Sequence, residues 1–254
     1  DVVIRTLEYA AGLDMTVVFY PEEHQIAKDG CVHEGFVASR QGLPMIPAIA
    51  ETIAIAKYLL MIEMTGVKAH FGLISAGASV ELIKIAKDKG LPVTADVAMH
   101  QLHLTDQLID GFNSLAHVRP PLRAEKDKEL LRQGVKDGVI DSICTHHEPL
   151  SSSAKLAPFA ETLPGMTAFD TYVPFGVQLV NEGVFEPLEW VEKVTLAPAK
   201  VANMVDRWSQ ESGWVLVDPE LQWTVSKENI LSQGKNTPLI NQNVRGKVIQ
   251  TFIG

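Results

Sequence analysis

Apolar side chains in the first hundred residues recur at two spacings, one helical and one extended. Residues 2–11 place apolar side chains every three or four positions and stop at Gly12, which predicts a helix. Residues 15–20 are a short β-branched and aromatic run, which predicts a buried strand. The same alternation continues, with further helices predicted at 47–64, 78–89 and 125–136 and further strands at 67–74, 93–98 and 139–145. Strands that alternate with amphipathic helices indicate βα units and a parallel sheet.

After residue 145 the regular alternation of strands and helices ends. Helical spacing continues at 167–182, 187–194 and 198–205, and the chain then closes with two strand-like pieces at 214–217 and 244–252. Four strands are half of an eight-stranded βα barrel, which normally takes roughly 250 residues in full. We therefore expect an α/β fold, the C-terminal part of a (β/α)8 TIM-type barrel with a small β appendage formed by the chain termini. Residues 1–205 would form the barrel portion and 206–254 the appendage, whose other strands would come from an N-terminal region outside this chain.

Composition narrows the possible partners. The chain has 254 residues, of which 46% are hydrophobic, so it can bury a core and fold. Its formal net charge of −9 argues against nucleic acid and anionic membranes as partners. We find no apolar run long enough to cross a membrane and no signal-peptide pattern. The two cysteines, Cys31 and Cys144, lie far apart in the sequence, so we expect no disulfide and a cytoplasmic protein.

The segment 144–150, Cys-Thr-His-His-Glu-Pro-Leu, is the strongest candidate for chemistry because it follows the apolar run 139–143. Loops at the carboxyl ends of parallel strands carry the chemistry of such folds. Two adjacent imidazoles, His146 and His147, suggest a metal site. Adjacent residues on a strand point to opposite faces, however, so only one of the two would enter the barrel mouth.

Three other groups have simpler interpretations. His100 and His103 have a helix-compatible ligand spacing near Asp96, but the absence of cysteines favours an ordinary hydrogen-bonded loop over a zinc site. His70 lies in an apolar strand, where a hydrogen-bonded core histidine is the default. Cys144 has no assigned base nearby, which favours a structural thiol over a nucleophile.

Several motifs, in order along the chain, are similar to those of one family. The run Val-Arg-Pro-Pro-Leu-Arg at 118–123, the helix at 125–136 and Thr-His-His-Glu-Pro at 145–149 resemble the dihydroorotases of the amidohydrolase superfamily. The segments 138–141, 155–159, 164–166, 235–239 and 246–248 resemble them too. The resemblance implies a distorted βα barrel that binds zinc at its strand ends and interconverts carbamoyl-aspartate and dihydroorotate. In such enzymes the metal generates the hydroxide nucleophile.

The positions that carry this chemistry in the family hold other residues here. The resemblance places Tyr20 and Leu73 at two ligand histidines, His146 at the aspartate that contacts metal and shuttles protons, and Leu150 at a further histidine. Arg119 stands where the family has a substrate-binding asparagine. The His-x-His pair of the first barrel strand lies outside this chain.

The resemblance is therefore closest to the non-catalytic dihydroorotase-like proteins that accompany aspartate carbamoyltransferase. It implies a pseudoenzyme of pyrimidine biosynthesis, an oligomer with that enzyme as partner, no functional catalytic residue and no cofactor. Arg119, Pro164 and Gly165 remain as weak substrate-binding residues, and any residual metal contact would be His146. The alternative is an active, zinc-dependent cyclic amidohydrolase with an altered site. A third hypothesis is a metal-free sensor that binds a pathway metabolite through Arg119 and Arg123.

Overall fold

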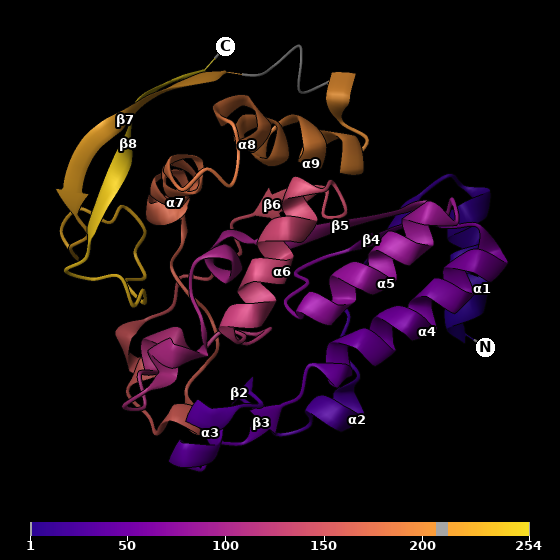
Figure 1. Ribbon diagram of the computed structural model, residues 1–254, viewed down its shortest axis with the longest axis horizontal. Helices are drawn as coiled ribbons and strands as arrows, with labels where there is room; N and C mark the ends of the chain where they lie inside the picture. Colours follow the sequence, from indigo (N-terminus) through magenta and orange to yellow (C-terminus); the bar gives the residue numbers. More distant parts are fainter. Residues whose placement is uncertain (1, 207–212, 254) are drawn as a thin grey trace.

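A four-stranded parallel sheet of order β1-β4-β5-β6 organises the larger part of the molecule (Figure 1). The computed structural model describes residues 2–206 and 213–253. The strands are β1 (Thr16–Phe19), β4 (Lys68–Phe71), β5 (Val93–Ala98) and β6 (Ser142–Cys144), and the helices between and before them are α1 (Val2–Gly12), α4 (Ile49–Thr65), α5 (Gly77–Asp88) and α6 (Glu125–Lys136). Consecutive strands pair in parallel across helical connections. The α/β fold expected from the sequence, one side of a βα barrel, is confirmed.

The helices lie in a row against the sheet, and small residues set their spacing (Figure 1). A Cβ atom at Gly134 of α6 would lie 2.7 Å from Val80 Cγ1 of α5, and one at Gly77 would lie 2.5 Å from Leu130 Cδ1. These glycines let α5 and α6 approach closely. Between helices and sheet lies one apolar core. It includes Ile55, Ile62, Phe71, Ile83, Val97, Leu131 and Ile143.

Predicted strands of the parallel sheet differ from the structure in burial or in length, and the strand expected at 67–74 is limited to β4. The strand expected to be buried at 15–20 is an edge strand in which exposed and half-buried residues alternate, and Val18 is 50% exposed. Its outer edge pairs with no strand in the described part of the chain. The strand expected at 139–145 is limited to β6, because residues 139–141 serve as the connection from α6.

A small lobe at the carboxyl end of the sheet has its own core. It contains the two-stranded parallel pair β2 (Val32–His33) and β3 (Met45–Ile46) and the short helices α2 (His24–Ala27) and α3 (Phe36–Gln41). Short 3-10 helices complete the loops: η1 (Met99–Leu102), η2 (Asp106–Ile109), η3 (Ser114–Ala116), η4 (Ser152–Lys155) and η5 (Phe159–Glu161). Two-residue strands leave no readable period in a sequence, so the pattern analysis missed this lobe.

The C-terminal part follows the predicted order of helices and then strands. It comprises α7 (Phe169–Asn181), α8 (Pro187–Val194), α9 (Leu196–Val201), β7 (Trp214–Thr224) and β8 (Asn243–Phe252). β7 and β8 form an antiparallel hairpin beside α7, and β7 continues past its predicted end through a register shift between Asp218 and Gln222. The division of the chain at residue 205 into two domains stays a prediction.

Replacing Gly246 by alanine tests the contact between the hairpin and α7. Gly246 has a φ of +97°, and an added Cβ would lie 2.8 Å from Val177 Cγ2. Because both backbone strain and overlap oppose the substitution, we expect G246A to lower the free energy of unfolding by about 1–3 kcal/mol. Urea denaturation measures the loss.

Gly12 provides the matched control, since a Cβ there would meet no atom within 4 Å. G12A should leave the free energy of unfolding within about 1 kcal/mol of the wild-type value. Equal effects of the two substitutions would contradict the assigned contact.

Candidate functional site

The carboxyl ends of β1, β4, β5 and β6 meet at one edge of the sheet, and the candidate residues follow these ends. Tyr20 comes directly after β1 and is 68% exposed. A Cβ atom at Gly72 would lie 2.9 Å from Tyr20 Cε1, so the tyrosine ring rests on the backbone beside Leu73. The structure therefore brings together the two positions at which the resemblance expects ligand histidines, but with an exposed phenol and an aliphatic side chain.

The backbone at two of the family's ligand positions is strained. Leu73 has a φ of +58° and His146 a φ of +45°, both in the left-handed region that non-glycine residues seldom adopt. Each such residue costs on the order of 1–3 kcal/mol and persists only where surrounding contacts hold it. Such strain is characteristic of functional sites, and here it coincides with two positions at which the resemblance expects metal contacts.

Asp96 is the centre of the hydrogen-bond network at this edge. Its Oδ1 accepts bonds from the Leu73 main-chain nitrogen at 2.8 Å and from Cys144 Sγ at 3.2 Å. Its Oδ2 lies 2.8 Å from His70 Nε2, and His70 Nδ1 lies 2.8 Å from Thr94 Oγ1. The network holds Leu73 in its strained conformation. The sequence pattern did not point to Asp96 as the centre of a network. The available signal was an acidic residue inside the apolar run 93–98, where a buried acid needs hydrogen-bond partners.

One sequence interpretation is confirmed by this network and another agrees with it. His70 is buried and both of its ring nitrogens have hydrogen-bond partners, as expected for a core histidine. Burial, and next the negative charge of Asp96, raise the pKa of the Cys144 thiol well above its ordinary value. A thiol that stays protonated is a poor nucleophile, which agrees with the structural role predicted for Cys144.

His100 contradicts the expected hydrogen-bonded loop. It lies in η1, is 1% exposed, and neither ring nitrogen has a hydrogen-bond partner in the described structure. Burial, with smaller contributions from His146 and His103, lowers its pKa to about 3. His103 also has an unpartnered Nε2 and stacks on Phe175 with 4.1 Å between ring centres. The prediction of a hydrogen-bonded loop failed for the His100 side chain because η1 is buried. Solvent therefore does not supply the hydrogen bonds that an exposed loop would receive.

His146 and His147 point in different directions, but both follow β6, which ends at Cys144, so the alternation of side chains along a strand is not the reason. The His146 side chain is 7% exposed, its ring centre lies 5.3 Å from that of His100, and its Nδ1 has no partner among the described residues. His147 instead accepts hydrogen bonds at Nδ1 from the main-chain nitrogens of Ala168 and Phe169, each at 3.1 Å. His147 thus caps the start of α7, and only His146 turns toward the residues after β5.

Arg119 forms an ion pair at the mouth. Its Nη2 lies 2.6 Å from Glu22 Oε1, and its Nε donates to both oxygens of the same carboxylate. Its Nη1 donates to the Gly30 carbonyl at 3.4 Å. The residue that stands at the family's substrate-binding asparagine is therefore bound within the chain.

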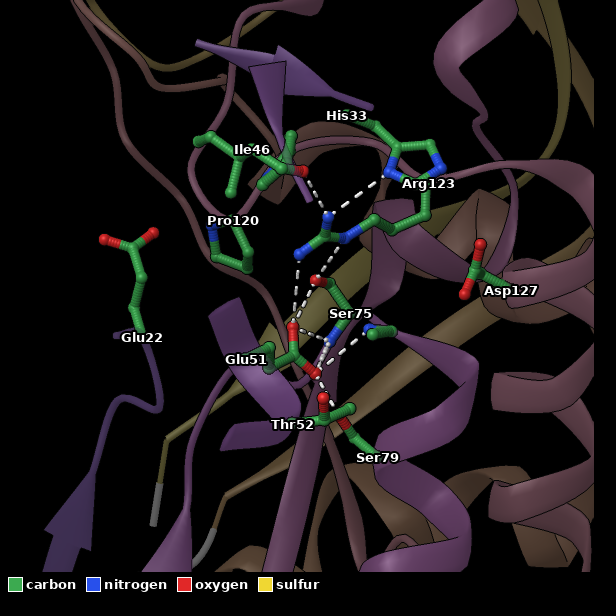
Figure 2. Close-up of polar contacts among 12 residues, drawn as sticks. Glu22, His33, Ile46, Glu51, Thr52, Ser75, Ser79, Pro120, Arg123 and Asp127 are labelled. Carbon is green, nitrogen blue, oxygen red and sulfur yellow. Dashed lines mark hydrogen bonds and ion pairs between the residues drawn. The ribbon is translucent and has the colours of Figure 1, made fainter. Parts of the chain in front are cut away.

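Arg123 is buried in a polar cluster rather than available at the mouth (Figure 2). It is 3% exposed, its Nη2 lies 3.6 Å from Glu51 Oε2, and its Nη1 donates to the Ile46 carbonyl at 2.9 Å. Its Nε donates to Ser75 Oγ at 3.0 Å. The hypothesis of a sensor that uses two free guanidiniums is wrong on this point, because Arg123 is enclosed.

Glu51 completes this cluster from α4. Its carboxylate accepts hydrogen bonds from the main-chain nitrogens of Ser75 and Ala76 and from Ser79 Oγ at 2.6 Å. The Ser75 hydroxyl donates to it as well. Sequence reasoning missed Glu51; the available signal was an acid on the buried face of an apolar helix.

The Pro164–Gly165 loop is fixed against the segment that follows β6. The Gly165 nitrogen donates to the His117 carbonyl at 2.9 Å, and its carbonyl accepts from Asn236 Nδ2 at 3.0 Å. Asn236 also accepts a bond from the Leu150 nitrogen at 2.7 Å. Both polar groups of Gly165 are thus used inside the chain. A role of Pro164 and Gly165 in substrate binding stays a prediction.

The donor set does not reproduce the family's metal centre. Across residues 2–206 and 213–253, no three His, Cys, Asp or Glu side chains are arranged to hold a metal ion. Leu73 has no donor atom, and the Tyr20 ring lies on Gly72. Two imidazoles, His100 and His146, are the metal-compatible groups with unpartnered nitrogens that lie beside each other.

Known proteins resemble this chain over nearly its whole length. Residues 2–79 match the sequence profile of the family described as dihydro-orotase-like. A dihydroorotase-like protein of Pseudomonas putida is 42% identical over 252 residues, which cover 98% of this chain and 59% of that protein. A dihydroorotase of Syntrophus aciditrophicus is 34% identical over the same shares. The chain therefore spans about three fifths of the length of these curated relatives.

Solved structures agree on the fold. The L-hydantoinase (dihydropyrimidinase) of Arthrobacter aurescens superposes with a TM-score of 0.84 at 20% identity, over 99% of this chain and 58% of that one. The inactive dihydroorotase-like domain of a CAD-like multifunctional protein from Chaetomium thermophilum superposes with a TM-score of 0.60 at 20% identity, over 80% and 54%. None of the helices in the described part combines the length and apolar character that a bilayer crossing requires.

Acid should destabilise this fold through its buried histidines. Burial is the main cause that lowers the pKa of His33 and His117 to about 4 and of His100 and His103 to about 3, from an ordinary value of 6.5. The unfolded chain therefore binds protons first as the pH falls. We expect full stability above about pH 6.5 and a loss as the pH falls from about 6.5 to the folded pKa of each histidine, about 4 for His33 and His117 and about 3 for His100 and His103, on the order of 1 kcal/mol per pH unit for each. Urea denaturation across this range measures it.

His117→Gln should reduce the slope of the unfolding free energy against pH by about the amount that one histidine contributes. This holds whatever the substitution does to the unfolding free energy at any single pH. The exposed His24→Gln serves as the control and should leave the slope unchanged. Identical slopes for wild type and H117Q would contradict the assignment.

Removing the charge of Glu51 should be far more costly than removing a surface charge. In E51Q the buried Arg123 guanidinium loses its counterion, so we expect unfolding to become easier by about 3–5 kcal/mol. Glu23→Gln is the control, because the Glu23–Lys57 pair is more exposed, and breaking it should cost less than about 1 kcal/mol. Thermal and urea unfolding of both variants measure the difference. A loss below that of E23Q would overturn the role given to Glu51.

Proposed function

Because this chain belongs to the dihydroorotase-like family of amidohydrolases, we propose that it is part of a catalytically silent member of that family. Its role would be structural, as a cytoplasmic partner of aspartate carbamoyltransferase in pyrimidine biosynthesis. The observation that carries the proposal is the chemistry at the strand ends. Tyr20, Leu73 and His146 stand where the resemblance to this family places two ligand histidines and an aspartate.

These substitutions remove the means of making a nucleophile. A catalytic metal in such a site lowers the pKa of bound water, and its ligands must present nitrogen or oxygen lone pairs to it. Leu73 presents none, and its main chain is held by Asp96. Without the aspartate that His146 replaces, proton transfer to the leaving nitrogen also lacks its carrier. The Arg119 guanidinium is paired with Glu22, which leaves it fewer hydrogen bonds to offer a substrate.

An assembly role is supported by one solved structure of the same fold. The inactive dihydroorotase-like domain from Chaetomium thermophilum is part of a multifunctional protein, which supports association with other enzymes.

Activity measurements test the silent state. With zinc supplied, the protein should not cyclise carbamoyl-aspartate at a rate typical of enzymes, roughly 1 per second or more. A dihydroorotase of known activity, assayed in parallel, is the control for substrate and metal. Turnover at an enzymatic rate would overturn the proposal.

The competing function is an active amidohydrolase with an altered site that uses His146. The unpartnered imidazole nitrogens of His146 and His100 favour it. It predicts turnover that His146→Asn abolishes, whereas the silent protein gives no turnover in either form. Wild type and H146N assayed side by side therefore separate the two functions.

Copurification tests the partner. Coexpressed with aspartate carbamoyltransferase of the same organism, the protein should elute with it as one complex of fixed mass by size-exclusion chromatography with light scattering. An unrelated TIM-barrel protein coexpressed in the same way is the control. Separate elution at micromolar concentrations would contradict the assembly role. It would not be evidence for catalytic activity.

A further inference from the structure

The outer face of α4 is apolar, although the inner face of the same helix already packs into the core (Figure 1). The buried residues of the helix include Ala50, Ala54, Ile55 and Ile62. On the opposite side the exposed residues are Ile49, Ile53, Ala56, Lys57, Leu60, Glu63 and Met64. The large apolar ones are exposed by 53% (Ile49), 39% (Ile53), 70% (Leu60) and 60% (Met64). A helix that is apolar on all sides is normally buried on all sides.

The next two helices of the row have charged outer faces. Their exposed charged residues are Glu81, Lys84 and Asp88 on α5 and Glu125, Lys126, Glu129 and Lys136 on α6. Each of these helices has a single exposed large apolar residue, Ile85 on α5 and Leu130 on α6. Apolar side chains that are exposed singly are ordinary, whereas a continuous apolar patch marks a contact with another molecule. The outer face of α4 is therefore a candidate contact surface.

The place of α4 in the fold leaves this face open. α4 contacts α1 on one flank and α5 on the other. In a βα barrel the helices form an outer ring around the sheet. A further βα unit would pair with the free edge of β1 and pack beside α1, so it would not cover the outer face of α4.

The apolar residues of this face are spaced as in paired helices. Ile49, Ile53, Ala56, Leu60 and Met64, here called the α4 strip, follow one another at intervals of four, three, four and four positions. Helices that pair along a seam repeat their apolar residues about every 3.5 positions. At about 100° per residue, Lys57 and Glu63 lie on opposite sides of the strip. Lys57 Nζ lies 2.6 Å from Glu23 Oε2, so the strip presents little net charge to a partner.

We propose that the α4 strip binds the same strip of a second copy of this chain, with the two helices antiparallel about a two-fold axis. A two-fold contact requires a self-complementary surface, in which residue i meets residue j and residue j meets residue i. The strip is self-complementary about a midpoint between Ala56 and Lys57. Ile49 then lies opposite the partner's Met64, and Ile53 opposite the partner's Leu60. The small Ala56 at the centre lets the two helices approach closely.

The exposed area is sufficient for a small interface. The large residues of the strip leave on the order of 400 Å² of apolar surface exposed, which is the size of the largest patch on a typical monomer. With the flanking atoms of both helices, two copies would bury a total on the order of 1,000 Å², the lower limit for a specific interface. We therefore expect a reversible dimer with a dissociation constant on the order of micromolar.

Sedimentation velocity of the protein alone, between about 1 and 100 μM, tests the dimer. The wild type should change from monomer to dimer across this range. Leu60→Glu should weaken association by at least about tenfold, because it places an unpaired carboxylate in the apolar contact. Ile85→Glu on α5 is the matched control, since it also replaces an exposed apolar side chain by a carboxylate, and it should leave the dimer unchanged.

Disulfide cross-linking tests the antiparallel arrangement. Under mild oxidation Ala56→Cys should cross-link two copies, because the axis brings this position close to itself, whereas Ile85→Cys should not. Met64→Cys alone should stay uncross-linked, but it should cross-link when mixed with Ile49→Cys. The native cysteines Cys31 and Cys144 have raised pKa values, which keeps them out of the reaction.

Three results would overturn the proposed contact: a monomeric wild type at every concentration, a dimer that survives in L60E, and cross-linking of M64C alone. If the wild type is monomeric and L60E instead loses its complex with aspartate carbamoyltransferase, the strip binds that enzyme and the second copy is wrong. Dimerisation is measured on the protein alone, so its failure is distinguishable from failure of the silent function or of the partnership.

Discussion

The buried ion pair between Glu51 and Arg123 is the interaction on which the mouth of this fold depends. It joins α4 to the start of α5 through Ser75 and to the lobe of β2 and β3 through the Ile46 carbonyl. Three stretches of the chain that are distant in sequence, 46–51, 75–79 and the loop at 123, therefore meet on one carboxylate and one guanidinium (Figure 2). A buried pair of this kind gives little net stability compared with an apolar replacement, but it permits only one arrangement of its partners. The geometry of the loops around the site follows from that constraint.

The strand ends hold two residues in a strained backbone conformation at positions where the resemblance to the family places metal contacts. Asp96 holds Leu73 in a left-handed conformation that leucine by itself disfavours, and His146 has a similar conformation after β6. A loop that had lost all constraint would relax to an ordinary conformation, because such strain requires compensation elsewhere. Its persistence here indicates that the surrounding hydrogen bonds serve the fold itself, independently of catalysis.

The sequence predicts long amphipathic elements well and short or solvent-dependent features poorly. The ends of α6 and β5 agree with their predictions because their apolar residues follow one period over a full element. The edge exposure of β1 could not be read from its composition, since a β-branched run looks the same with or without a neighbouring strand. Asn236 and Glu51 were missed because their partners lie far along the chain. The unpartnered nitrogens of His100 depend on burial by distant segments and leave no local signal.

The raised pKa of both thiols has a practical consequence for physical studies of this protein. Cys31 and Cys144 are free, and burial is the main cause that raises the pKa of each. Thiol-directed labels react with the thiolate, so the native cysteines should be slow to modify while the fold is intact. A single cysteine introduced on the exposed edge of β1 would then carry a fluorophore or spin label selectively, with no need to remove the native pair. Distances between that edge and a bound protein could then be measured while both native cysteines are kept.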